Sequence, residues 1–254
     1  MKRILPVFFF SLLAITYSSA QAGELASLSI ISQQTGQPIK IWRHAGRNYI
    51  AGTNGQRYSL QIKNKLDVRL LSVVAVDGIN VITGDTAAPD QSGYVLEADQ
   101  QQEIAGWRKS MQQVAAFYFT DLSDTYAART GRSEQAGVIG IALYREKNAM
   151  VRPSTIEARR KRAYDENVAK SSQRAQSAPL QAQGPESEDK LGTGHGERIQ
   201  SESRSTEFLR ASKTPSEMLT VYYDSYANLV ARGIIPRHLD HPSPFPNRFV
   251  PDPS

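Results

Sequence analysis

A histidine and a glutamate stand two residues apart in a glycine-rich stretch, LGTGHGERIQ, at residues 191–200. Imidazole nitrogens and carboxylate oxygens are both zinc ligands, so His195 and Glu197 would supply two of the roughly three protein ligands of a catalytic site. His238 and His241, in HLDH, would have to supply the rest. The corresponding chemistry is metal-dependent hydrolysis. No spacing in the chain matches an established zinc motif, so this role is kept as an alternative.

The glycines of the same stretch favour a structural interpretation. Gly192, Gly194 and Gly196 suit positive φ angles and sharp turning, so we expect a turn here through which the chain re-enters a sheet. The chain also has no cysteine and no G-x-S-x-G motif for a nucleophile. We therefore predict no catalytic residue, no bound metal and no cofactor.

A second group of residues is better suited to recognition than to catalysis. Trp107 and Arg108 lie in GWRKS, and Tyr126 and Arg129 lie in DTYAARTGR. Aromatic rings and guanidinium groups are enriched at binding interfaces, so these four residues are the predicted binding site. A carbohydrate-binding module that uses Trp107 and Tyr126 is an alternative. The structural interpretation is that both rings fill a core and bond their polar ends at a sheet edge.

The N-terminal segment has the pattern of a secretory signal peptide. Lys2 and Arg3 precede an apolar run at residues 4–17, and Ala20 and Ala22 are the small residues that a signal peptidase reads. We expect residues 1–22 to be removed after Ala22, which predicts a periplasmic or secreted protein. No later segment is apolar for long enough to span a membrane.

Residues 24–147 are predicted to form an antiparallel β-sandwich. In RYSLQIK, residues 57–63, apolar and polar residues alternate, as in a strand with one buried face. In DVRLLSVVAVDG, residues 67–78, both faces are apolar, which indicates a strand covered on both sides. Repeated short strands separated by polar turns predict about nine strands in two packed sheets.

Local signals refine this picture. Asp77 and Gly78 predict a hairpin turn. Gly106, inside the strand pattern QEIAGWRKS, indicates a bulge or a close approach of another backbone. Asp124 and Gly131 are expected to begin and end a short helix.

After residue 147 the composition becomes polar. Residues 148–190 have a basic run and few large apolar residues, so we expect a disordered linker. Residues 191–235 should dock on the sandwich, with a short strand, LTVYY, that ends at Tyr223 and a helix from about Asp224 to Arg232. The tail, residues 236–254, is proline-rich and should be extended.

The formal net charge is +5 for 254 residues, and the expected leader carries two of these charges. A charge this small argues against nucleic acid as a partner. Without cysteine the exported chain has no disulfide and relies on its core alone.

Longer stretches carry a family resemblance. VDGINVITGDTAAPDQSGYVL, GWRKS, AAFYFTDLSDTYAARTGR and GVIGIALYRE, followed by LGTGHGE and TPSEMLTVYYDSYANLVARGII, resemble a group of exported proteobacterial proteins without an assigned activity. The chain has Thr125 where the group has Ser, and Ser133 where it has Pro. The resemblance implies a bacterial envelope protein and no catalytic residue. We therefore expect an exported, non-enzymatic binding protein whose partner is an envelope protein or a glycan.

Overall fold

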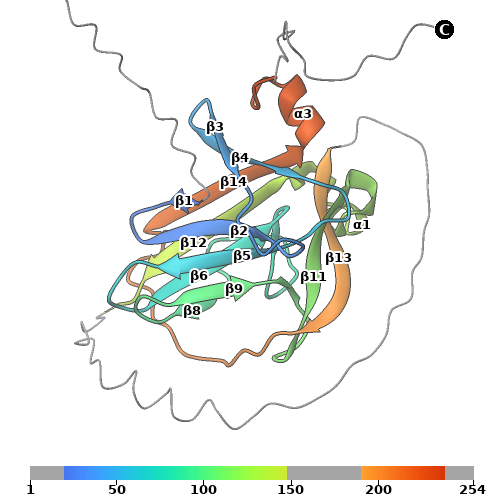
Figure 1. The fold of residues 1–254 in the computed structure, drawn as a ribbon. Helices are drawn as coiled ribbons and strands as arrows, with labels where there is room; N and C mark the ends of the chain where they lie inside the picture. Colours follow the sequence, from blue (N-terminus) through green and yellow to red (C-terminus); the bar gives the residue numbers. More distant parts are fainter. Residues whose placement is uncertain (1–19, 148–189, 238–254) are drawn as a thin grey trace, which may run out of the picture.

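The computed structural model describes residues 20–147 and 190–237. Within these ranges two seven-stranded sheets pack against each other with few helical residues (Figure 1), which confirms the predicted all-β sandwich. The first 19 residues of the expected leader, the expected linker up to residue 189 and the expected tail from residue 238 lie outside the described residues.

Sheet A has the strand order β1-β2-β5-β11-β10, with β9 also paired to β5 and β13 to β11. Its strands are β1 (Gln21–Ala22), β2 (Ala26–Ser32), β5 (Arg57–Asn64), β9 (Gln101–Ile104), β10 (Gly106–Arg108), β11 (Gln113–Asp121) and β13 (Leu191–Gln200).

Sheet B has the order β3-β4-β14-β12-β6-β7, with β8 also paired to β6. Its strands are β3 (Ile41–His44), β4 (Arg47–Gly52), β6 (Leu70–Val76), β7 (Ile79–Asn80), β8 (Tyr94–Leu96), β12 (Val138–Arg145) and β14 (Glu217–Ser225). The described ranges thus hold more strands than the nine or so expected, because several are only two to four residues long. The β14–β4 pair is parallel, which the prediction of a fully antiparallel sandwich missed.

The helical segments lie in two places. Between β11 and β12 are η1 (Leu122–Asp124), α1 (Tyr126–Arg129) and η2 (Ser133–Gln135), and after β14 comes α3 (Tyr226–Ala231). No helix in the described ranges is long and apolar enough to cross a membrane.

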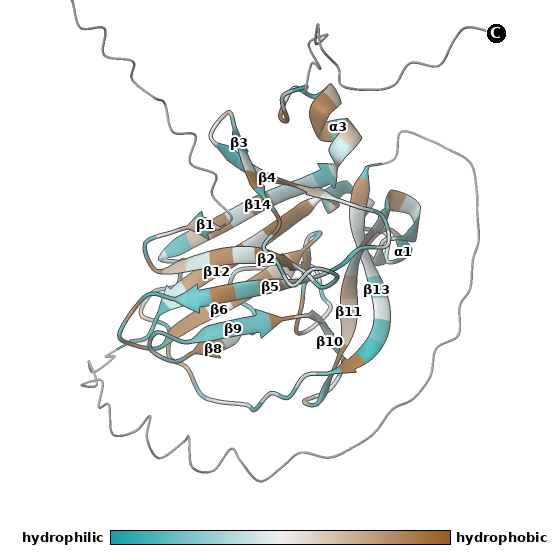
Figure 2. Cartoon of the chain, viewed as in Figure 1, coloured by the Kyte–Doolittle hydropathy of each residue, from teal (hydrophilic) through white to brown (hydrophobic). Residues whose placement is uncertain are grey.

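The main core lies between the sheets, where the apolar faces of the strands meet (Figure 2). Strand β6 is buried on both faces, as its sequence predicted. Val74 and Val76 belong to the main core, whereas Leu71 and Val73 belong to a smaller cluster on the outer face of sheet B, against which Phe208 packs. Part of the C-terminal segment therefore covers this outer face.

The structure confirms two local predictions, the turn at Asp77 and Gly78 and the close approach at Gly106, and corrects a third, the helix cap. Asp77 and Gly78 both have positive φ angles, 50° and 70°, and join β6 to its hairpin partner β7. Gly106 is a point of close approach, since a Cβ there would lie 2.0 Å from the carbonyl oxygen of Ala115. The expected helix cap was wrong by one residue: the Oγ1 of Thr125, and not Asp124, accepts from the first turn of α1.

The glycine-rich stretch is not a turn. It forms β13, which pairs antiparallel with β11 over most of that strand's length. Its glycines do not have positive φ angles; instead they leave room for neighbours. A Cβ on Gly192 would lie 2.2 Å from the Cγ2 of Thr125, and one on Gly194 would lie 2.2 Å from the Cζ of Tyr118. The glycines permit close packing against neighbouring side chains, a second role that glycine has in sheets.

The remainder of the C-terminal segment enters the other sheet. Strand β14 lies between β4 and β12, so it is an interior strand of sheet B. Helix α3 begins after Ser225, whose Oγ accepts from the backbone N–H of Asn228 at 3.1 Å, and is followed by Gly233 with φ +69°. Both positions agree with the predicted strand-to-helix change to within two residues.

A buried polar link joins the two sheets at the end of β6. The carboxylate of Asp77 accepts from the backbone N–H of Gly137 at 2.9 Å, from the backbone N–H of Thr193 at 2.7 Å and from the hydroxyl of Tyr223 at 2.5 Å. The Oγ1 of Thr193 lies 2.6 Å from the hydroxyls of both Tyr223 and Tyr58. All four side chains that form this link are buried, so it fixes β13 and β14 to the rest of the fold.

Burial sets the protonation of this link. It raises the pKa of Asp77 to about 6, although the hydroxyl of Tyr223 and the backbone N–H groups oppose the shift. Burial and the nearby carboxyl also raise the pKa of Tyr58 and Tyr223 well above the usual phenol value, so both phenols stay protonated.

Candidate binding site

The four predicted binding residues do not share one surface. Trp107 and Arg108 are neighbours on β10, and neighbouring residues of a strand point to opposite faces. Trp107 is 1% exposed, its Nε1 donates to the carbonyl oxygen of Gly194 at 3.2 Å, and its ring packs edge-on against Phe117. Trp107 is therefore a core residue with no surface to offer a ligand, which also removes it from the carbohydrate-binding alternative.

Tyr126 and Arg129 lie together on α1. The ring of Tyr126 is half-buried between Trp107, with ring centroids 5.0 Å apart, and His195, at 5.3 Å. Arg129 is exposed and lies 3.6 Å from the carboxylate of Asp124, which is exposed as well. The structure therefore brings Tyr126 and Arg129 next to His195, a residue that the sequence had placed in a different candidate site.

His195 and Glu197 do not converge on one point. The pairing of β13 with β11 shifts by one residue between His195 and Arg198, and Glu197 forms an ion pair with Arg57 at 2.5 Å. Burial and the positive charges of Lys109, Arg129 and Arg198 lower the pKa of His195. The same charges disfavour a metal cation at this imidazole. In the described ranges no group of three or more His, Cys, Asp or Glu side chains is placed to hold a metal, and His238 and His241 lie outside those ranges.

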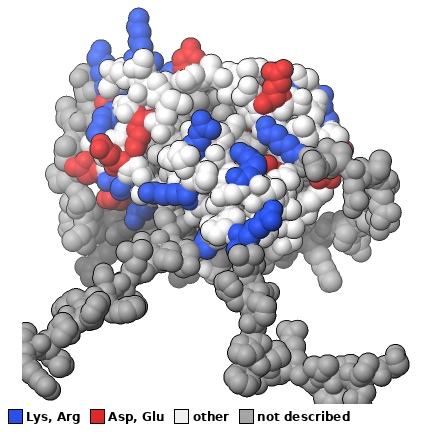
Figure 3. Space-filling view, turned by 90° about the horizontal axis from the view of Figure 1, so that it is seen from above, with Lys and Arg blue, Asp and Glu red and all other residues white. Residues whose placement is uncertain are grey.

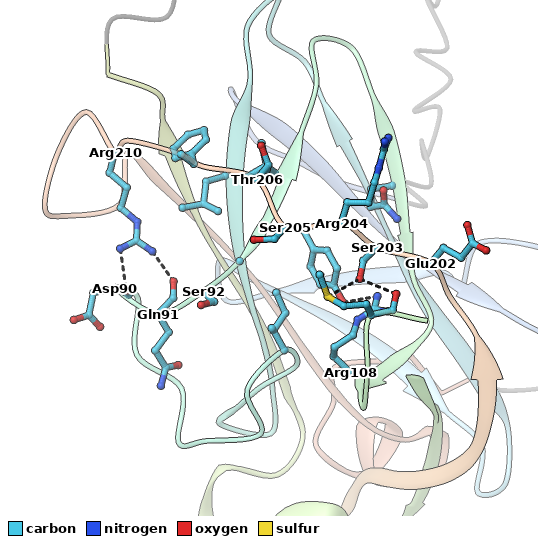
Figure 4. Close-up of a pocket in the computed structure, with 18 residues that line it drawn as sticks. Asp90, Gln91, Ser92, Arg108, Glu202, Ser203, Arg204, Ser205, Thr206 and Arg210 are labelled. Atoms are coloured by element: carbon cyan, nitrogen blue, oxygen red, sulfur yellow. Dashed lines mark hydrogen bonds between the residues drawn. The ribbon is translucent and has the colours of Figure 1, made fainter. Parts of the chain in front are cut away.

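A groove with a volume of about 580 Å³ lies beside β8 and is lined by residues of both sheets (Figure 4). One side is formed by the segment at residues 201–210, which we call the strap, and the other by the loop at residues 90–93 together with β8. Arg108 lines the groove, so one predicted binding residue lies in it. The apolar part of the groove lining is formed by the side chains of Leu71, Ile82, Tyr94, Val95, Met111 and Phe208.

The N-terminal end of the strap is fixed by hydrogen bonds to the β10–β11 hairpin. The backbone N–H groups of Ser201 and Ser203 donate to the carbonyl oxygens of Gln112 and Met111, each at 2.8 Å. The guanidinium of Arg108 donates to the carbonyl oxygen of Ser201 at 2.5 Å. The side chain of Arg108 is thus an anchor of the groove wall.

The C-terminal end of the strap is fixed to the opposite side of the groove. Arg210 donates to the carbonyl oxygens of Asp90 at 2.7 Å and Gln91 at 2.5 Å, as Figure 4 shows, and its guanidinium lies 4.6 Å from the ring centroid of Tyr144. The backbone N–H of Lys147 donates to the carbonyl oxygen of Leu209 at 2.7 Å. The groove is therefore formed before any ligand arrives, which lowers the entropic cost of binding.

The centre of the strap differs from its ends. Residues 204–208 belong to no helix or strand, and none of their backbone N–H or C=O groups has a hydrogen-bond partner elsewhere in the described ranges. Five consecutive residues with free backbone groups resemble an unpaired sheet edge. No sequence pattern predicted the groove beneath the strap.

The face shown in Figure 3 carries basic side chains interspersed with acidic ones, so it has no continuous field of one sign. This mixed surface does not favour a long polyanion such as nucleic acid. No family model, curated protein or solved structure matches this chain.

Proposed function

We propose that this protein is an exported, non-enzymatic binding protein whose groove takes an extended segment of a partner protein in the cell envelope. The observation that carries the proposal is the strap, which is anchored at both ends while the backbone of residues 204–208 is unpaired within the described structure.

An extended peptide is the ligand that matches such a backbone. Addition of a peptide strand to a free edge pairs N–H and C=O groups on both chains, and alternate side chains of the peptide enter the pocket beside the edge. The apolar surface contributed by Val95, Phe208 and their neighbours would take these side chains. Polar side chains such as Gln91, Gln102 and Glu202 also line the groove, so a peptide with both apolar and polar side chains suits it.

The cellular location rests on the sequence. The leader pattern in residues 1–22 and the resemblance to exported proteobacterial proteins support export, and an exported protein meets its partners in the envelope.

The test uses peptides selected from a random displayed library against the full mature protein. Thr206→Pro removes a backbone donor from the strap, whereas Thr206→Ala keeps the donor and removes the same side chain. We expect the proline variant to bind the selected peptides about tenfold more weakly, as the loss of one or two hydrogen bonds predicts, and the alanine variant to bind normally.

Equal binding by both variants would contradict strand addition at the strap. Glycan binding that is lost on Tyr126→Ala, with no peptide selected, would instead favour the carbohydrate-binding alternative.

A further inference from the structure

A cluster of basic side chains lies near Tyr126, and none of its members lines the groove. Lys109 follows β10, Arg129 lies on α1, and His195 and Arg198 lie on β13. The Nζ of Lys109 lies 5.3 Å from the ring centroid of Tyr126, and the imidazole of His195 lies 5.3 Å from the same ring. Elements distant in sequence thus bring Lys109 and His195 to one half-buried aromatic ring, with Arg129 on the helix that carries the ring and Arg198 close enough to act electrostatically on Lys109 and His195.

The fold holds this cluster in place from below. Trp107 is buried under Tyr126, and its indole N–H donates to the carbonyl oxygen of Gly194, the residue before His195. The Oγ1 of Thr125 accepts from the backbone N–H of Ala128 at 2.9 Å and fixes the start of α1. Packing therefore positions Tyr126 and His195 before any ligand is present.

The cluster has little compensating negative charge. Within the described ranges the side chains of Lys109, His195 and Arg198 form no ion pair. Arg129 has an exposed contact with Asp124 at 3.6 Å, which solvent screens. The nearest acidic residue on β13, Glu197, is paired with Arg57.

Burial, and to a smaller extent repulsion between like charges, disfavours the charged forms of His195 and Lys109. Burial and the charges of Lys109, Arg129 and Arg198 lower the pKa of His195, and burial and the charge of Arg198 lower the pKa of Lys109. Positive groups held close together raise the free energy of each other's charged form. An anion bound between them lowers that free energy again.

We propose that Lys109, Arg129, His195 and Arg198 form a binding site for a phosphate ester, with the ring of Tyr126 as the surface on which the esterified group lies. A phosphate ester carries up to two negative charges and several acceptor oxygens, which suits several cations better than a single carboxylate does. Arginine guanidinium groups match the geometry of phosphate oxygens, and a tyrosine ring gives contact area to the attached group. This inference is independent of peptide binding in the groove.

The first experiment follows the imidazole of His195 by NMR in the full mature protein during titration with inorganic phosphate at fixed pH. We expect a saturable change in its chemical shift, because phosphate favours the charged imidazole. The exposed His44, on the β3–β4 hairpin, is an internal control that should not respond. Sodium chloride at equal ionic strength should leave His195 unchanged.

Single substitutions, compared with a control on another surface, test which side chains bind phosphate. Arg198→Gln and Lys109→Gln each remove one charge from exposed residues, so each should bind phosphate about tenfold more weakly while the circular dichroism spectrum stays unchanged. Arg43→Gln removes an exposed charge from β3 and should have no effect. An unresponsive His195 in the wild-type protein, or equal affinity in all three variants, would overturn the proposal.

Vesicles separate the two sources of a phosphate ester. Phosphatidylcholine vesicles with and without phosphatidylglycerol are sedimented with the protein. Phosphate binding together with retention on phosphatidylglycerol supports a lipid headgroup, and phosphate binding without retention supports a soluble ester. Retention without any response of His195 to phosphate would indicate nonspecific adsorption and overturn the site.

Discussion

Asp77 should make the protein less stable as the pH rises from about 4 to about 7. Its pKa is raised from 3.8 to about 6 in the folded protein. Each pKa unit corresponds to about 1.4 kcal/mol, so a shift of roughly two units corresponds to about 3 kcal/mol of folding free energy.

The sign follows from which state binds the proton. Between the unfolded and folded pKa values the folded protein holds a proton on Asp77 that the unfolded chain has lost. The stabilisation is therefore complete below about pH 4 and is lost as the pH rises through about 6. This direction is opposite to that of a carboxylate stabilised by a salt bridge.

Asp77→Asn isolates this contribution. An asparagine has a single acceptor oxygen, so its NH₂ group must face the backbone N–H of either Gly137 or Thr193. One buried donor then lacks a partner, which costs about 1–3 kcal/mol. We expect the variant to be less stable than the wild type by that amount near pH 4 and nearly as stable near pH 7, where the wild type carries the buried charge.

The assay is urea unfolding at a series of pH values, followed by the fluorescence of the tryptophans. Asp85→Asn, in an exposed loop, is the control and should leave the pH dependence of the wild type unchanged. A constant difference between wild type and Asp77→Asn across the pH range would refute the assignment of a raised pKa to this carboxyl.

Three further substitutions and one control, Gly140→Ala, test the packing. Gly106→Ala places a Cβ 2.0 Å from a backbone oxygen of Ala115 and should cost at least about 3 kcal/mol of unfolding free energy, whereas Gly140→Ala meets no atom within 4 Å and should change it by less than about 1 kcal/mol. Thr193→Val removes the hydroxyl shared by two buried phenols and should cost about 1–3 kcal/mol in chemical denaturation. Trp107→Ala should lower the unfolding free energy by about 3–5 kcal/mol, measured by calorimetry, because the side chain is buried.

The sequence was informative wherever a pattern is local. The alternation in residues 57–63 identified β5, the two-sided apolar run before Asp77 identified β6, and the β-forming residues before Tyr223 identified β14. Each signal depends only on which face of a strand is buried, and periodicity reports that directly.

The candidate site was predicted less well. Trp107 and Arg108 were grouped as one surface, although adjacent residues of a strand face opposite sides, and this rule alone would have separated them. Lys109 and Arg198 were not singled out, because each is an ordinary exposed cation until β13 is placed beside β11. Gly192 and Gly194 were interpreted by their backbone freedom, since close packing over a neighbouring side chain has no local signature.

Asp77 illustrates why the buried polar link between the sheets could not be predicted from the sequence. Its interpretation as a turn residue is correct, since it has φ 50° beside Gly78. Its burial, however, depends on Thr193 and Tyr223, which lie 116 and 146 residues further along the chain. A pattern of period two states which face is buried and not which strand covers it.

The position of β14 links this carboxyl to completion of the fold. The β3–β4 hairpin joins sheet B only through β14, so without that strand the sheet is divided. Strands β13 and β14 also supply the backbone N–H of Thr193 and the hydroxyl of Tyr223 to Asp77. Without β13 and β14, the carboxyl of Asp77 would therefore lack two of its hydrogen-bond donors, the backbone N–H of Thr193 and the hydroxyl of Tyr223, and would be less buried. Docking of the C-terminal strands therefore completes both the burial that raises the pKa of Asp77 and the hydrogen bonds that oppose this rise.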